Sequence, residues 1–211
     1  MQQQFEHIYW IGGSPCSGKS TIADQLAARH NWVAYHCDQS FAAHVERANP
    51  DREPWLDKVR TLVWDDFWMR PPDVQLRNVI EVYAEEFPMI VDDLLALPSD
   101  RPIVAEGTAL LPELVTTVLA ASQQAIWMVP TADFQREYYP RRGAWVQTIL
   151  NQCQQPEQAL HNWMNRDIAT AQHVLQEARA RQFEIQVVDG SRPIEGYLRL
   201  VEYYFGLLQD D

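Results

Sequence analysis

The chain has 211 residues, of which 46% are hydrophobic and 22% charged, and its formal net charge is -12. This balance is typical of a folded globular domain and excludes a disordered or fibrous chain. Because a negative field repels phosphate backbones and anionic headgroups, we expect neither nucleic acid nor membrane as a partner. The apolar run near the N-terminus is too short for a signal sequence, and the three cysteines form no CxxC pair, so we expect a cytoplasmic protein with reduced thiols.

The first part of the chain predicts a strand, a loop, a helix and a second strand. Residues 7–12 are apolar and rich in β-forming side chains, and glycines follow them. Residues 19–30 place Ile22, Leu26 and Ala27 on one helical face. Residues 32–37 then predict a short buried strand that ends at Asp38. We expect a right-handed βαβ unit with parallel strands.

The middle of the chain, about residues 39–100, changes to amphipathic helices. Their expected breaks lie at Asn49-Pro50, Pro71-Pro72 and Pro88. Aromatic side chains gather on one face of this segment, which we interpret as a helical substrate-binding insertion.

After the insertion the chain again alternates between strands and helices. In chain order, we expect a strand at 102–105, a helix at 110–121, a strand at 125–129, helices at 146–152 and 156–181, a strand at 184–188, and a final amphipathic helix. Five short apolar strands alternating with helices predict one α/β domain over residues 1–211, with three αβα layers and a five-stranded parallel sheet. Ligands of such sheets bind at the carboxyl ends of the strands, where we expect Gly13, Asp38, Glu106 and Asp189.

Residues 13–20, GSPCSGKS, form the strongest motif of the chain. Its glycines let backbone N–H groups converge on an anion, and the following helix adds the positive end of its dipole. Lys19, which is one of only two lysines, would reach the β and γ phosphates, and the Ser20 hydroxyl would bind Mg²⁺. The alternative is a glycine-rich turn without a ligand. The predicted phosphate contacts are Gly13, Ser14, Pro15, Cys16, Ser17, Gly18, Lys19, Ser20 and Thr21.

On this motif and layout the chain resembles P-loop NTPases, and within them the small-molecule kinases such as adenylate, shikimate and gluconate kinases. The resemblance implies an ATP-dependent and Mg²⁺-dependent transfer of phosphate to a small metabolite or nucleotide. It implies that Asp38 contacts the phosphoryl acceptor, although a helix N-cap or a turn aspartate is the alternative. Glu106 matches an acidic position near magnesium where the family usually has aspartate, and a capping or ion-paired glutamate is equally consistent. Gly107 beside it would let a substrate approach the backbone.

The resemblance also implies a lid that carries arginines, at about residues 131–166. We favour Arg136 and Arg166 as catalytic, with Arg141 and Arg142 next, and the alternative for each is an exposed surface arginine. The loop after the last strand would contact the nucleotide base through Gly190 and Ser191. As an ordinary turn with Ser191 as a helix cap, this loop is explained almost as well.

Two arginines and an aromatic cluster of the insertion are candidates for acceptor binding. Arg70 and Arg77 flank Pro71-Pro72 and would bind a phosphate or carboxylate. Trp64, Phe67 and Trp68 would stack on a planar group, or form the core of the subdomain. Two other functions stay open: a regulatory nucleotide switch without an acceptor, and a binding module that has lost turnover. An NKxD run, which would indicate a GTPase, is missing from the sequence.

Overall fold

The computed structural model describes residues 2–208. Its five strands are β1 (Ile8–Gly13), β2 (Val33–His36), β3 (Ile103–Glu106), β4 (Ala125–Pro130) and β5 (Glu184–Val188). All pair in parallel, in the order β2-β3-β1-β4-β5. The helices are α1 (Lys19–His30), α2 (Cys37–Arg47), α3 (Pro54–Val59), α4 (Trp64–Trp68), α5 (Pro72–Ala96), α6 (Pro112–Val115), α7 (Ala132–Tyr138), α8 (Ala144–Leu150), α9 (Pro156–Ala180) and α10 (Ile194–Tyr204), with 3-10 turns η1 (Gln2–Phe5), η2 (Ser122–Gln124) and η3 (Tyr139–Arg141).

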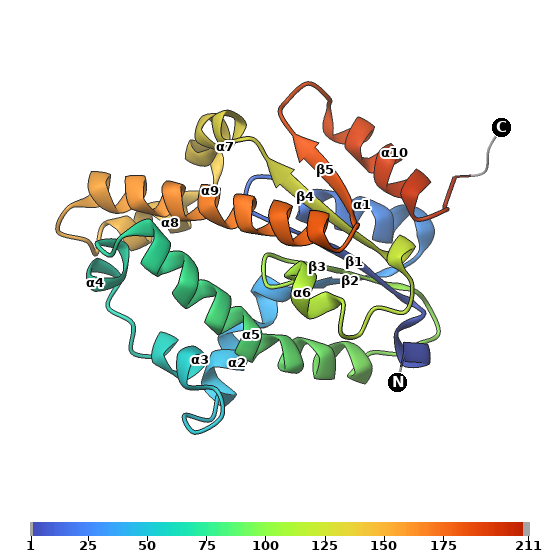
Figure 1. Cartoon of the computed structure of the whole chain (residues 1–211), viewed down its shortest axis with the longest axis horizontal. Helices are drawn as coiled ribbons and strands as arrows, with labels where there is room; N and C mark the ends of the chain where they lie inside the picture. The colour runs from blue at the N-terminus through green and yellow to red at the C-terminus, as the bar shows by residue number, and fades with distance from the viewer. Residues whose placement is uncertain (1, 209–211) are drawn as a thin grey trace.

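Helices cover both faces of the sheet, which confirms the predicted three-layer α/β architecture. Side chains of a strand point alternately to opposite faces, and β1 shows this directly. Trp10 packs against α5 and α9, whereas Ile11 packs against α1 and α10. In Figure 1, α9 crosses the near face of the sheet and α1 lies behind it. Because both faces are buried, the strands are apolar almost throughout.

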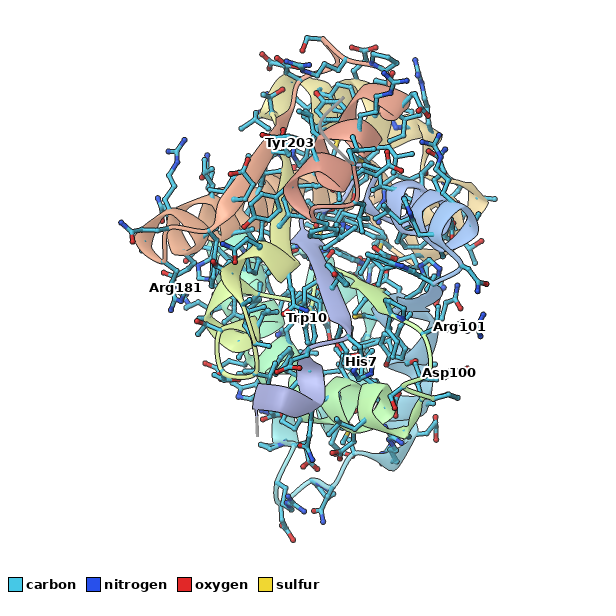
Figure 2. All side chains as sticks on the ribbon, turned by 90° about the vertical axis from the view of Figure 1, so that its right-hand side faces the viewer. His7, Trp10, Asp100, Arg101, Arg181 and Tyr203 are labelled. Carbon is cyan, nitrogen blue, oxygen red and sulfur yellow. The ribbon has the colours of Figure 1, made fainter. Side chains whose placement is uncertain are left out.

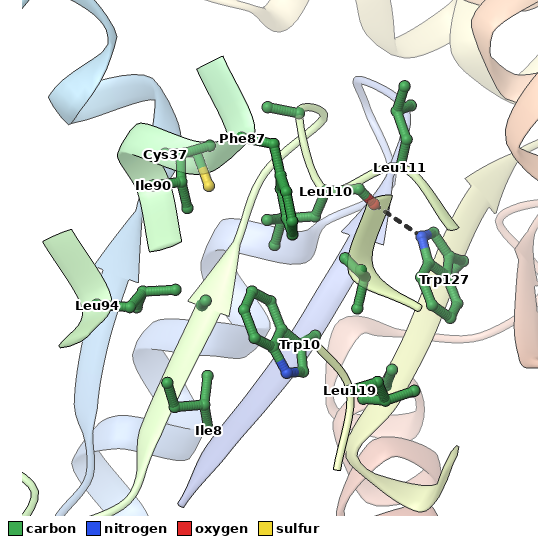
Figure 3. Packing of buried hydrophobic residues seen from close by; sticks show 14 of the residues in the cluster. Ile8, Trp10, Cys37, Phe87, Ile90, Leu94, Leu110, Leu111, Leu119 and Trp127 are labelled. Carbon is green, nitrogen blue, oxygen red and sulfur yellow. Dashed lines mark hydrogen bonds between the residues drawn. The ribbon is translucent and has the colours of Figure 1, made fainter. Parts of the chain in front are cut away.

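Two indoles fill the core beneath α5 and α9 (Figure 3). Trp10 and Trp127 come from the neighbouring strands β1 and β4, and both are fully buried. The Trp127 Nε1–H group donates a hydrogen bond to the Leu110 carbonyl, at 2.8 Å. A buried indole N–H without an acceptor would be costly, so this bond fixes the segment after β3 onto the sheet.

Two of the expected elements are wrong. Residues 110–121 do not form a continuous helix, because only α6 (Pro112–Val115) is helical and turns follow it. Pro88 does not break the insertion, since it lies inside the continuous helix α5. Its neighbours Phe87 and Ile90 are buried in the core, and this packing outweighs the hydrogen bond that proline removes.

The amino ends of the strands lie opposite the edge where ligands are expected. His7 precedes β1, and its carbonyl accepts a hydrogen bond from the backbone N–H of Ile103, the first residue of β3. Figure 2 shows His7, Asp100 and Arg101 together at this end. No helix within residues 2–208 combines the length and the apolar character that a membrane crossing requires.

Candidate functional site

The carboxyl ends of β1, β2 and β3 bring three predicted site segments to one edge of the sheet. Glu106, the last residue of β3, pairs in register with Ile11 of β1 and with His36 of β2. Gly13 ends β1, and Asp38 lies in the first turn of α2, directly after β2. The structure therefore places Gly13, Asp38 and Glu106 side by side, as the strand pattern predicts.

Three residues give the loop at 13–20 its shape. Gly13 has a φ of 135° and Gly18 a φ of 82°. A Cβ on Gly13 would lie 1.9 Å from the Met128 carbonyl oxygen of β4, so glycine is required there by the neighbouring strand as well as by its backbone angle. Cys16 also adopts a left-handed conformation, with a φ of 68°, which a residue other than glycine rarely does.

The interior of the loop is polar and closely packed around Lys19. The Lys19 side chain is 7% exposed, and its Nζ donates a hydrogen bond to the Ser14 carbonyl at 3.0 Å. Ser14 and Ser17 are buried, and their hydroxyls have no hydrogen-bond partner within residues 2–208. Ser20 and Thr21 are exposed in the first turn of α1. The loop thus presents an ammonium group and unpaired hydroxyls next to a helix N-terminus.

Glu106 is part of a chain of charged side chains at the ends of β2 and β3. Its Oε1 lies 2.8 Å from Nδ1 of His36, and Nε2 of His36 lies 3.1 Å from Oδ1 of Asp24. Burial opposes the charged form of His36, but the bonds to Glu106 and Asp24 outweigh it and raise the imidazole pKa. Among the roles considered for Glu106, the structure shows a partner for the ion pair, and that partner is His36.

Packing gives a reason for glycine at position 107. A Cβ at this position would lie 2.6 Å from the Cβ of Cys37, which fills the space beside β3. Glycine is thus required by the close contact between the end of β3 and the start of α2, and approach of a substrate to this backbone stays a prediction.

Two of the four arginines of the predicted lid share one buried carboxylate. Asp167 of α9 is 1% exposed, and its Oδ1 lies 2.7 Å from Nε of Arg166, an ion pair without the geometry of a hydrogen bond. Its Oδ2 accepts hydrogen bonds from Arg142 at 3.2 Å and from the Tyr139 hydroxyl at 3.0 Å. Arg142 also lies over the Trp145 ring, 5.0 Å from its centroid. We call Arg142, Arg166, Asp167 and Tyr139 the arginine cluster.

The other two lid arginines make exposed contacts within their own segment. Arg136 pairs with Asp133 at 3.3 Å, one turn earlier on α7. Arg141 lies 3.9 Å from Glu137 and stacks over the Tyr138 ring. The structure therefore groups Arg166 with Arg142, whereas the sequence favoured Arg166 with Arg136. Exposed pairs of this kind contribute little to stability.

Replacing Asp167 by asparagine is expected to destabilise the fold by about 3 kcal/mol, because two arginines would lose the carboxylate they share in a buried site. For a chain of this size that corresponds to a fall in melting temperature of roughly 6 to 12 °C. Calorimetry would measure it. Asp133→Asn, which removes the exposed partner of Arg136, is the matched control and should leave the melting temperature unchanged within about 1 °C. Equal melting temperatures for both variants would show that Asp167 does not hold the cluster.

The loop after β5 is stabilised by Asp189. Its Oδ1 accepts hydrogen bonds from the backbone N–H and the hydroxyl of Ser191, at 2.9 and 2.6 Å. Ser191 is thus not a cap of α10, which begins after Pro193 without a side-chain cap. Gly190 has a φ of 83°, and a Cβ there would lie 3.0 Å from the Phe134 ring. The structure accordingly gives Gly190 and Ser191 local roles, and base contact stays a prediction.

Asp38 is exposed and lines a cavity of about 440 Å³ together with Phe41, Tyr83, Glu86 and Trp145. The N-cap position of α2 is His36, so the alternative of Asp38 as a helix cap is wrong. Glu86 is 1% exposed, and its Oε1 lies 2.9 Å from Nδ1 of His44. Burial raises the pKa of Glu86, against the opposing effect of His44.

The aromatic cluster of the insertion is both core and cavity wall. Trp68 stacks on Trp163 of α9 with centroids 4.0 Å apart, and Phe67 is buried beside it. Phe67 and Trp68, with Trp64 and Arg70, line a second cavity of about 430 Å³. Arg77 does not line this cavity and pairs with Asp73 at 3.1 Å on the exposed face of α5. The two arginines that flank Pro71-Pro72 thus have different surroundings.

Sequence reasoning missed Asp167, Tyr83, Glu86 and Trp145. Asp167 follows Arg166 directly, and this adjacency of opposite charges was an available signal. Tyr83 and Glu86 carry no local signal, because they resemble other residues of an amphipathic helix. Within residues 2–208 no group of three or more His, Cys, Asp or Glu side chains is arranged to hold a metal ion. Magnesium binding by Ser20 stays a prediction.

Comparisons with known proteins give only general likenesses. No protein-family model and no curated protein matches the chain. An uncharacterized protein from Eubacterium ventriosum is similar in structure, with a TM-score of 0.47 and 16% identity over 94% of this chain and 97% of that one. A "putative kinase" from Chloroflexus aurantiacus has a TM-score of 0.42 and 13% identity, over 96% of this chain and 98% of that one. These likenesses concern the overall layout of the chain, and no function follows from them.

Proposed function

We propose that the chain is a magnesium-dependent phosphotransferase that moves the γ-phosphoryl group of ATP to a hydroxyl group of a small molecule. One observation supports this most: the loop at 13–20, Asp38 and the arginine cluster share neighbours. Cys16 of the loop packs against the hydrophobic cluster that contains Tyr139. Trp145, over which Arg142 lies, lines the cavity beside Asp38. Removal from water raises the pKa of Tyr83, on which the charges of Arg166 and Asp38 both act.

The residues of the loop fit a bound triphosphate. Its backbone amides and the N-terminus of α1 would hold the phosphates, and the unpaired hydroxyls of Ser14 and Ser17 would gain acceptors. Lys19 would exchange the Ser14 carbonyl for phosphate oxygens. Magnesium bound at Ser20 would neutralise charge between the β and γ phosphates.

Phosphoryl transfer would then take place between the loop and Asp38. The acceptor oxygen forms a bond to the γ-phosphorus while the bond from the γ-phosphorus to the bridging oxygen breaks, so that ADP leaves. The hydroxyl proton passes to the Asp38 carboxylate, which is exposed on the cavity wall. Arg142 and Arg166 would neutralise negative charge on the transferred group.

The cavity that Asp38 lines and the adjoining aromatic one favour a kinase over a nucleotide switch, because a switch that only hydrolyses its nucleotide has no acceptor to hold. The test is ADP formation by purified protein with ATP and Mg²⁺, across a panel of hydroxylated compounds. We expect at least one acceptor to raise the rate about tenfold or more, with the phosphorylated product identified by mass spectrometry. Slow hydrolysis that no acceptor accelerates would instead support the switch.

A further inference from the structure

The cavity lined by Trp64, Trp68 and Arg70 has an aromatic wall, and we call it the aromatic cavity. Its volume of about 430 Å³ lies in the range of sites for small organic ligands. Five of the chain's eight tryptophans line it, namely Trp55, Trp64, Trp68, Trp145 and Trp163. They come from four helices, α3, α4, α8 and α9, so the wall exists only in the folded chain. Such a surface favours flat rings, which stack on indoles and gain little from water.

The cavity extends along one face of α5 toward Asp38. Asn78, Val79, Val82 and Tyr83 line it, and Tyr83 and Glu86 line the other cavity, beside Asp38. These positions follow the spacing of a single helical face. At 1.5 Å per residue, Asn78 and Glu86 are about 12 Å apart along the axis. Phe41, Tyr83 and Trp145 belong to both cavities, so the two adjoin. A molecule of two fused rings with a substituent at each end spans this length.

The charges of the aromatic cavity are mainly positive, although the whole chain is acidic. Lys58, Arg70 and Arg166 line it, against one carboxylate, that of Asp66. Lys58 is the chain's second lysine, and its ammonium lies 4.0 Å from the Trp55 ring centroid. Arg70 is exposed just before α5, at the end of the helix away from Glu86. Besides the indole N–H groups, the uncharged polar groups of the wall are the side chains of Thr61, Asn78 and Tyr83, few for matching the edge of a nucleobase.

We infer that the phosphoryl acceptor is a hydroxylated aromatic acid: a carbocyclic ring system with a hydroxyl at one end and a carboxylate at the other. This inference rests on the proposed function and specifies its substrate class. The rings would lie among the tryptophans, the carboxylate near Arg70, and the hydroxyl beside Asp38. The product is the aryl phosphate, formed as ADP leaves and the hydroxyl proton passes to Asp38.

Calorimetric titration of the full chain with 6-hydroxy-2-naphthoate, without nucleotide, tests the substrate class separately from turnover. We expect saturable binding, at least fivefold weaker binding of 2-naphthol, which lacks the carboxylate, and no measurable binding of gluconate, which lacks the ring. Equal affinity for naphthoate and 2-naphthol, or an affinity for AMP that matches naphthoate, would overturn the inference. So would the absence of naphthoate binding.

A matched pair of variants on either side of Pro71-Pro72 locates the site. Arg70→Ala should weaken naphthoate binding about tenfold, because it removes a charged partner from the cavity. Arg77→Ala removes the same charge outside the cavity and should leave the affinity within about twofold. Equal losses of naphthoate affinity in the two variants would indicate a general electrostatic effect and would overturn the proposed binding site. If naphthoate binds as expected but does not stimulate ADP formation with ATP, the proposed function fails while the ligand class stands.

Discussion

Replacing Lys19 by alanine is expected to lower ATP turnover about a thousandfold, which corresponds to roughly 4 kcal/mol of transition-state stabilisation. The ammonium is the cation buried within the loop at 13–20, and the two unpaired serine hydroxyls beside it cannot neutralise phosphate charge. A coupled assay of ADP release, with ATP titrated to saturation, measures the loss in kcat/KM.

The control for Lys19→Ala is Arg101→Ala. Arg101 is exposed at the amino end of the strands, where its bond to the Asn31 side chain, at 3.4 Å, is long. The Arg101→Ala variant removes one positive charge from the opposite end of the sheet and should leave turnover unchanged within about twofold. If Lys19→Ala keeps more than about a tenth of the activity while it remains folded, the phosphates are not held where we propose.

Replacing Asp38 by asparagine is expected to lower phosphoryl transfer about a hundredfold or more while ATP affinity changes less than twofold. The amide has nearly the shape of the carboxylate but cannot take the acceptor's proton. Asp38 is exposed and makes no side-chain bond that caps α2, so the fold should tolerate the change. Single-turnover transfer and equilibrium binding of ATP, measured on the same preparation, separate the two effects.

Asp51→Asn, in the exposed turn after α2, removes a negative charge away from the cavities and serves as the control for Asp38→Asn. Its transfer rate should equal that of the wild type. Loss of both ATP binding and transfer in Asp38→Asn would indicate a structural role, in which Asp38 stabilises the first turn of α2 through the helix dipole. Unchanged transfer would assign proton removal to another group.

Local pattern was sufficient to predict the strands and several of the helices. Residues 184–188 and 19–30 carry their structure in their own spacing of apolar side chains, and both elements lie where expected. The segment at 110–121 has a similar pattern, yet Trp127 takes the Leu110 carbonyl and most of the segment forms turns. Pro88 is the converse case, where burial of Phe87 maintains a helix that the local signal would end.

The candidate site was predictable where strand ends fix positions, and less so where distant helices meet. Gly13, Asp38 and Glu106 follow buried strands, so parallel pairing alone brings them together. Which lid arginines act together depends on Asp167, whose contact with Arg142 joins residues 25 positions apart. Gly107 is a second example, because glycine is required there by the Cys37 side chain, which belongs to another element. Contacts between elements leave no periodic trace in the sequence.

The carboxylate of Asp167 has a consequence for nucleotide entry. It carries the charge that a phosphate oxygen would bring, and it already holds Arg142 and Arg166 in a largely buried place. Under the proposed function, an incoming triphosphate exchanges one counter-ion of these arginines for another. Buried pairs are screened less than exposed ones, so the two arginines stay oriented even in concentrated salt. The protein then enters each cycle with its lid arginines already positioned, and an acidic chain retains a local site for an anion.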